Sequence, residues 1–119
     1  MDNNKKIKIY HNASCSKSRQ ALAIVEENSS KFEIIEYLKN PLTVKEIKVL
    51  LQQLNIKASE LLRTQEAIWK EKYKGKILTD NEIINIMEKN PKLIERPIVE
   101  YNNKAVIGRP ADNILSLFT

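Results

Sequence analysis

A strand, a polar turn and a helix open the chain, and a second strand follows directly. Residues 7–10 are a short run of β-formers that ends at a polar turn. Apolar residues then recur at helical spacing over 21–25, and residues 32–37 are typical of a second strand. A strand, a crossover helix and a strand pack most simply as a parallel pair with a right-handed crossover. This opening predicts an α/β fold.

The only cysteine, Cys15, stands where the first helix is expected to begin. The unpaired N–H groups and the dipole of a helix N-terminus favour a thiolate and lower a thiol pKa from about 8.5 into the range of about 3.5 to 7.5. His11 and Lys17 would add to this effect, and Ser16 or Ser18 would be placed to donate a hydrogen bond. Sites in open α/β sheets lie at the carboxyl ends of strands, so we expect a cleft here. The alternative is that Cys15 is an unreactive, buried residue that packs as a small apolar side chain.

Helices occupy the middle of the predicted fold. Thr-x-x-Glu capping boxes at 43–46 and 79–82 each precede apolar residues at helical spacing. Two shorter helical pieces are expected at 58–63 and 65–73, between those helices. The sequence therefore predicts a helical insertion.

A β-hairpin and a last helix follow. The runs 96–101 and 104–107 flank two asparagines, which tolerate the positive φ angles of a type I′ turn. Pro110 suits the first turn of the helix that comes next. The order β-α-β, helices, β-β-α is that of a thioredoxin-like α/β fold with a helical insertion, and we expect a single domain over 1–119.

Composition narrows the classes of function. The net charge is +5, and sixteen of the twenty basic residues are lysine, so an arginine marks a position where a planar guanidinium serves a carboxylate or an oxyanion. The four arginines are Arg19, Arg63, Arg96 and Arg109. Each is alternatively an ordinary surface cation.

The same composition addresses location and partners. No signal-peptide pattern or long apolar run is present, and one cysteine forms no internal disulfide, so we expect a cytoplasmic protein without a membrane span. Lysines and aromatic residues alternate over 69–76 as on some nucleic-acid surfaces. Because Glu71 interrupts that charge and no RNA-binding signature accompanies it, we expect no nucleic-acid partner.

Three arginines are expected to serve the thiol. In a thioredoxin-like layout the residue before the hairpin, Arg96, approaches the cysteine, and topology favours a cis peptide bond to Pro97. Arg109 follows the paired strand, and Arg63 lies in the helical insertion. Three guanidinium groups would bind a multiply charged oxyanion and neutralise charge that develops on it.

These positions carry a resemblance to a known family. Its motifs are His11-Asn12 with Cys15, Ser18 and Arg19; Leu61-Leu62-Arg63; residues 94–99; and Gly108-Arg109-Pro110. Over nearly the whole chain they resemble the glutaredoxin-linked arsenate reductase family. The resemblance implies that Cys15 is the nucleophile and redox thiol, that His11 helps to keep it ionised and that Ser18 hydrogen-bonds it. The implied substrate-binding residues are Asn12, Arg63, Arg96 and Arg109.

The resemblance also implies a reaction and its partners. Arsenate would be reduced without a bound cofactor, and glutathione with glutaredoxin would supply the external thiol, because the chain has no second cysteine. We expect a monomer. Two features depart from the family: Ala13 stands where proline is usual, and the chain ends soon after the last predicted helix, as in the short branch of the family.

Other thiol chemistries fit less well. A phosphatase loop needs arginine at the position of Ala21, and a Cys-x-x-Cys pair needs a thiol at Ser18. One cysteine and one histidine are too few for a tetrahedral metal site, and no cysteine-protease constellation is present. Two alternatives stay open: a thioredoxin-fold oxidoreductase with another substrate, and a non-enzymatic Spx-like regulator that binds RNA polymerase.

Overall fold

The structure, a computed structural model, describes residues 6–118. Its contacts divide the chain into two compact units, one formed by the chain up to Asn40 and from Arg96 onward, the other by Pro41–Glu95. The single domain expected over 1–119 stays a prediction. Across the described part of the chain, no helix combines the length and the apolar character needed to cross a bilayer.

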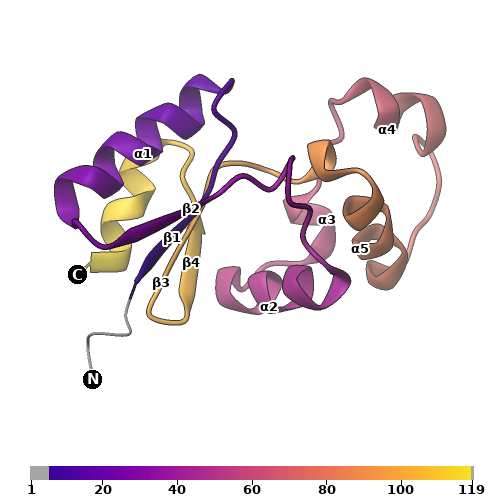
Figure 1. The fold of residues 1–119 in the computed structure, drawn as a ribbon. Helices are drawn as coiled ribbons and strands as arrows, with labels where there is room; N and C mark the ends of the chain where they lie inside the picture. The colour runs from indigo at the N-terminus through magenta and orange to yellow at the C-terminus, as the bar shows by residue number, and fades with distance from the viewer. Residues whose placement is uncertain (1–5, 119) are drawn as a thin grey trace. The chain divides into compact units, whose positions relative to one another are not determined.

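The first unit contains a four-stranded sheet with the strand order β2-β1-β3-β4 (Figure 1). β1 (Ile7–Tyr10) and β2 (Phe32–Ile35) are parallel, and α1 (Ser16–Asn28) connects them. β3 (Ile98–Tyr101) runs antiparallel to β1 and pairs with β4 (Lys104–Ile107). The predicted β-α-β unit and hairpin are both confirmed.

The core of this unit holds α1 against the sheet. It also includes η3 (Ala111–Phe118), the yellow helix that lies alongside α1 in Figure 1. Six buried residues form its centre: Ile7, Ile9, Ala21, Val25, Val99 and Ile114. Burial of a large aliphatic side chain contributes about 1.5–3 kcal/mol. This packing fixes the turn between β1 and α1, where Cys15 lies.

Three boundaries in the first unit differ from the sequence prediction, and the first is that β3 begins at Ile98 rather than at Arg96, because the cis peptide bond between Arg96 and Pro97 precedes it. β2 ends at Ile35 because the Glu36 carbonyl accepts turn hydrogen bonds from the Lys39 and Asn40 N–H groups, at 3.0 and 2.9 Å. The last helix is a 3₁₀-helix that begins after Pro110, so the prediction that Pro110 lies in its first turn is wrong. The two asparagines of the hairpin turn do have positive φ angles, 53° and 64°.

The second unit is helical. Its α-helices are α2 (Val44–Leu54), α3 (Ala58–Leu61), α4 (Ala67–Lys72) and α5 (Asp80–Lys89), followed by the 3₁₀-helix η2 (Pro91–Leu93). Both predicted capping boxes are present, whereas α3 and α4 are shorter than the predicted pieces. α2 and α3 pack on α5 and bury a core that includes Ile47, Leu50, Leu61, Ile83 and Met87.

Candidate active site

Cys15 is the N-cap residue of α1, at the end of a tight polar turn. Its N–H donates to the Asn12 carbonyl at 2.9 Å, and the Ser14 N–H donates to Asn12 Oδ1 at 3.0 Å. Asn12 therefore shapes the turn with both its backbone and its side chain. The substrate-binding role predicted for Asn12 stays a prediction.

The surroundings of the Cys15 thiol favour its ionised form. Burial raises the pKa of the thiol, but the Ser18 N–H, the Arg96 side chain and the Lys17 N–H, together with the Arg96 charge, outweigh this effect and bring the pKa to about 7. The thiol is half-buried and therefore still accessible. Because the thiolate is the nucleophile, a large fraction of this cysteine is reactive near neutral pH.

Arg19 has a role in this turn that the sequence analysis did not assign. Its Nη1 donates to the Ala13 carbonyl at 2.8 Å, and its N–H donates to the Cys15 carbonyl at 3.1 Å. Ala13 is the position at which a proline is usual in the family resembled. The hydrogen bond from Arg19 thus restrains the turn where the ring of a proline would have restrained it.

His11 follows β1 directly and is buried, with 6% of its surface exposed. Burial lowers its pKa, the Arg19 charge lowers it further, and the Glu36 charge and the Ser18 backbone only partly oppose them. Its Nδ1 has no hydrogen-bond partner among residues 6–118. The imidazole is therefore mainly neutral near pH 7, and its predicted role in keeping the thiol ionised stays a prediction.

Ser18 acts on the thiol through its backbone. Its side chain is fully buried, and its Oγ makes no hydrogen bond to any residue between 6 and 118. The Ser18 N–H, in contrast, is the strongest of the groups that lower the Cys15 pKa. The Ser18 hydroxyl thus makes no hydrogen bond among the described residues, and the Ser18 N–H acts on the thiol pKa instead, because position 18 is the third residue of α1 and its N–H has no partner within the helix.

Arg96, one of the three predicted arginines, acts on the Cys15 thiol in the structure. The Arg96-Pro97 peptide bond is cis, as predicted, and the Pro97 carbonyl accepts from the Gly108 N–H at 2.8 Å. A Cβ at Gly108 would lie 3.1 Å from Pro97 Cγ, which is tighter than most Cβ contacts, so this close approach favours glycine. The next residue, Arg109, is exposed and also precedes a cis proline.

Arg63 belongs to the unit Pro41–Glu95. Its side chain is only 13% exposed and forms ion pairs with Glu66 and Glu95. The substrate-binding roles predicted for Arg63 and Arg109 stay predictions.

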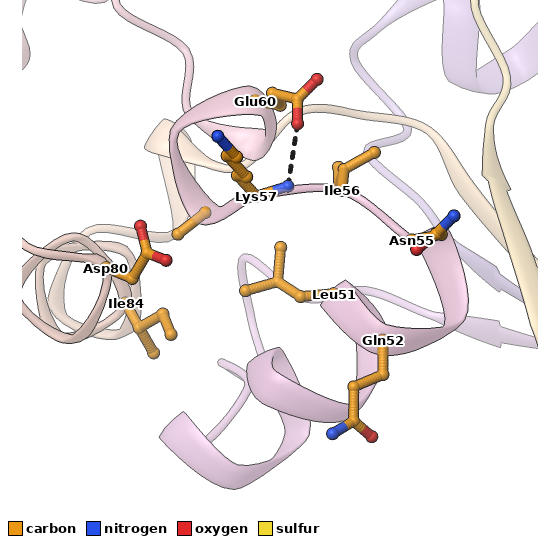
Figure 2. A pocket seen from close by; sticks show the side chains of 9 residues that line it. Leu51, Gln52, Asn55, Ile56, Lys57, Glu60, Asp80 and Ile84 are labelled. Atoms are coloured by element: carbon orange, nitrogen blue, oxygen red, sulfur yellow. Dashed lines mark hydrogen bonds between the residues drawn. The ribbon is translucent and has the colours of Figure 1, made fainter.

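A separate hollow of about 540 Å³ lies in the helical unit (Figure 2). Leu51, Ile56 and Ile84 supply apolar lining, and Figure 2 shows Asp80 near Ile84 on one side of it. Lys57 and Glu60 also line it, but the Glu60 carboxylate accepts from the Lys57 N–H at 2.9 Å and so caps α3. None of the predicted site residues lines this hollow. In residues 6–118, no cluster of three histidine, cysteine or acidic side chains is arranged to hold a metal ion.

Comparisons with known proteins agree with one another. The model of the ArsC family matches residues 10–117. An arsenate reductase of Neisseria meningitidis serogroup B is 37% identical over 110 residues, which cover 91% of this chain and 94% of that protein. The uncharacterized protein YfgD of Escherichia coli strain K12 is 42% identical over 115 residues, covering 95% of this chain and 97% of its own.

A solved structure is also similar to this chain in fold. The arsenate reductase from Vibrio cholerae has a TM-score of 0.91 and 39% identity, and the likeness covers 95% of this chain and 98% of that one. The fold described above is thus similar to that structure over nearly the full length of both chains. The chain therefore belongs to the ArsC family, and its α/β fold is the thioredoxin-like fold predicted from the order of its elements.

Proposed function

We propose that the protein is a monothiol arsenate reductase. The observation that carries the proposal is the Cys15 thiol, whose pKa is brought to about 7 by two N–H groups at a helix N-terminus and by Arg96. Membership of a family that includes arsenate reductases supports the choice of substrate. Arg96, Arg109 and Arg63 are proposed to bind the oxyanion, with Asn12 shaping the turn beside the nucleophile.

The proposed reaction begins at sulfur. The Cys15 thiolate attacks the arsenic(V) of arsenate, so that a sulfur–arsenic bond forms and an arsenic–oxygen bond breaks, with the oxygen leaving as water after protonation. A guanidinium such as that of Arg96 neutralises charge on the oxyanion while the bond forms. Because the His11 imidazole is mainly neutral, we propose that it affects the pKa of the thiol without carrying a positive charge.

Reduction needs thiols from outside the chain, because Cys15 is its only cysteine. A first external thiol attacks the arsenic of the adduct, forming a second sulfur–arsenic bond as another oxygen leaves as water. A second external thiol then attacks the sulfur of the first, so that these two thiols become one disulfide and the electron pair of the broken sulfur–arsenic bond reduces arsenic(V) to arsenic(III). Water hydrolyses the remaining Cys15 sulfur–arsenic bond, which releases arsenite and restores the Cys15 thiol. Glutathione with glutaredoxin is the proposed donor pair. The proposal places the reaction in the cytoplasm, where thiols are kept reduced.

The test is arsenate-dependent consumption of NADPH in an assay coupled through glutathione, glutaredoxin and glutathione reductase. We expect turnover with the wild type and a loss of at least about 1000-fold with Cys15→Ser, because a hydroxyl cannot provide a comparable nucleophile near pH 7. Lys17→Ala is the matched control for a change within the same turn of α1, since only the backbone of Lys17 acts on the thiol. Wild-type turnover that persists in Cys15→Ser, or no turnover with any thiol donor, would contradict the proposal.

A further inference from the structure

Arg63 lies between two carboxylates within the helical unit. Its Nη2 is 3.3 Å from Glu66 Oε2, and its Nε is 3.9 Å from Glu95 Oε1. The three side chains are 13%, 29% and 28% exposed, so their charges are partly shielded from water. The third nitrogen, Nη1, is buried and has no hydrogen-bond partner within residues 6–118. Among these described residues, the Nη1 corner of the guanidinium thus has no hydrogen-bond partner, whereas each of the other two corners faces a carboxylate.

The backbone holds Arg63 and Glu95 together. Leu62 and Ile94 form an isolated antiparallel bridge, in which the Arg63 N–H donates to the Leu93 carbonyl at 2.7 Å and the Glu95 N–H donates to the Leu61 carbonyl at 2.8 Å. The four apolar residues of this bridge are between 0% and 8% exposed. The position of Glu95 relative to Arg63 is therefore fixed by hydrogen bonds inside an apolar core.

Glu66 is held much less firmly. It is the N-cap residue of α4 but makes no side-chain capping hydrogen bond, and α4 contains no buried residue. Its N–H reaches the Arg63 carbonyl only at 3.5 Å. The Glu66 side chain can therefore rotate away from Arg63 without disturbing the core, whereas Glu95 cannot leave without breaking the bridge.

We infer that the Glu66 carboxylate occupies, in the anion-free protein, the Nη2 position of Arg63 that an oxyanion takes when it binds. The inference rests on the proposed function, in which Arg63 is an oxyanion-binding residue. A tetrahedral oxyanion binds a guanidinium best through two parallel hydrogen bonds, and Nη1 with Nη2 provides that pair of donors. With both carboxylates in place the cluster has a net charge of −1, which repels an anion. Displacement of Glu66 removes that repulsion, while Glu95 continues to orient Nε.

Glu66 would accordingly be a residue that sets the affinity of the site for oxyanions, because any oxyanion that binds Arg63 through Nη2 must first displace the Glu66 carboxylate. The kinetic test compares the wild type with Glu66→Gln. We expect KM for arsenate to fall by about threefold to tenfold with kcat nearly unchanged, since a neutral amide competes poorly for the guanidinium. Glu66→Asp, which keeps the charge on a shorter side chain, should give an intermediate KM.

Two controls separate displacement from a general effect of charge. Glu71→Gln removes the same charge from an exposed position on α4 and should leave KM unchanged. In an Arg63→Ala background, Glu66→Gln should no longer lower KM, because the group for which the carboxylate competes is gone. An unchanged or increased KM in Glu66→Gln, or an equal decrease in the Arg63→Ala background, would overturn the inference.

A binding experiment tests the inference without turnover. Isothermal titration of the Cys15→Ser protein with inorganic arsenate, and separately with sulfate, should show an affinity about threefold to tenfold higher when Glu66→Gln is added. Equal affinities, or no anion binding in either protein, would overturn the inference even if the wild type reduces arsenate. The expected gain in affinity together with an absence of arsenate turnover would instead support the inference about Glu66 and contradict the proposed reductase activity.

Discussion

The N-termini of α1 and α5 differ in what binds their unpaired N–H groups. At α5 the Thr79 hydroxyl accepts from the Glu82 N–H at 3.2 Å, and the Glu82 carboxylate accepts from the Thr79 N–H at 2.9 Å. At α1 the N-cap residue is Cys15, whose side chain makes no capping hydrogen bond. The N–H groups of Lys17 and Ser18 instead lower the pKa of the thiol.

The difference shows how one backbone feature serves either stability or reactivity. The capping box of α5 keeps its two hydrogen bonds throughout the neutral pH range. The reason is that the Thr79 N–H and hydroxyl hold the pKa of the Glu82 carboxyl below its usual range, so the carboxylate stays ionised. A cysteine at the same position satisfies the helix donors fully only as a thiolate. The α1 terminus therefore gives up part of a capping interaction and gains an ionised nucleophile.

The largest expected effect concerns the cation at the α1 terminus that has no counterpart at α5. Arg96→Ala removes both the side-chain hydrogen bond and the charge that lower the Cys15 pKa. The midpoint of iodoacetamide alkylation against pH should move upward from about 7, and the rate at pH 7 should fall by about threefold to tenfold. Stopped alkylation followed by mass spectrometry measures both quantities.

Lys17→Ala is the matched control for Arg96→Ala, because it removes a cation while the Lys17 N–H still acts on the thiol. Its alkylation profile should stay close to that of the wild type, and its affinity for oxyanion should decrease much less than that of Arg96→Ala. Equal shifts in the two variants would show that the helix terminus alone sets the thiol pKa and that the Arg96 contact is unimportant.

The second effect tests the α5 side of the comparison. Thr79→Ala removes the hydroxyl that accepts from the Glu82 N–H and should lower the free energy of unfolding by about 1 kcal/mol. Urea unfolding followed by circular dichroism measures the change. Thr64→Ala, at an exposed position outside the helices, should cost much less. A loss at Thr79 no larger than at Thr64 would mean that the cap contributes little to this unit.

Local sequence signals explain which parts of the fold could be predicted. The Thr-x-x-Glu boxes and the pair Asn102-Asn103 specify hydrogen bonds and backbone angles within a few residues, and the structure has them. The end of β2 was mispredicted because Glu36 and Tyr37 continue the strand pattern, whereas a turn hydrogen bond to the Glu36 carbonyl ends it. Tyr37 is buried although it lies outside the strand, and this is why an apolar residue at that position looked like part of the strand pattern.

Two residues of the candidate site, Cys15 and Arg96, could be predicted from the sequence. The strand-turn-helix pattern places Cys15 at a helix start, and topology brings Arg96 to it. The contribution of the Ser18 N–H rather than its hydroxyl, and the hydrogen bond from Arg19 to the Ala13 carbonyl, depend on three-dimensional geometry that residue types do not specify. The pairing of Arg63 with Glu95 likewise joins segments distant in sequence.

The smallest expected effect makes the α1 terminus resemble that of α5. Cys15→Ser places a hydroxyl at the N-cap, where serine accepts well from the N–H of Lys17 or Ser18, so the variant should be more stable at pH 6 by about 0.5 kcal/mol. The folded thiol has a pKa of about 7, below the unfolded value of about 8.5, so the thiolate stabilises the wild type fully above about pH 8.5 and loses that contribution as pH falls through 7. The advantage of the variant should therefore shrink as pH rises from 6 and reverse by pH 9. Urea unfolding at both pH values measures it, and a variant that is less stable at pH 6, or a difference independent of pH, would show that the thiol and the helix donors are not linked.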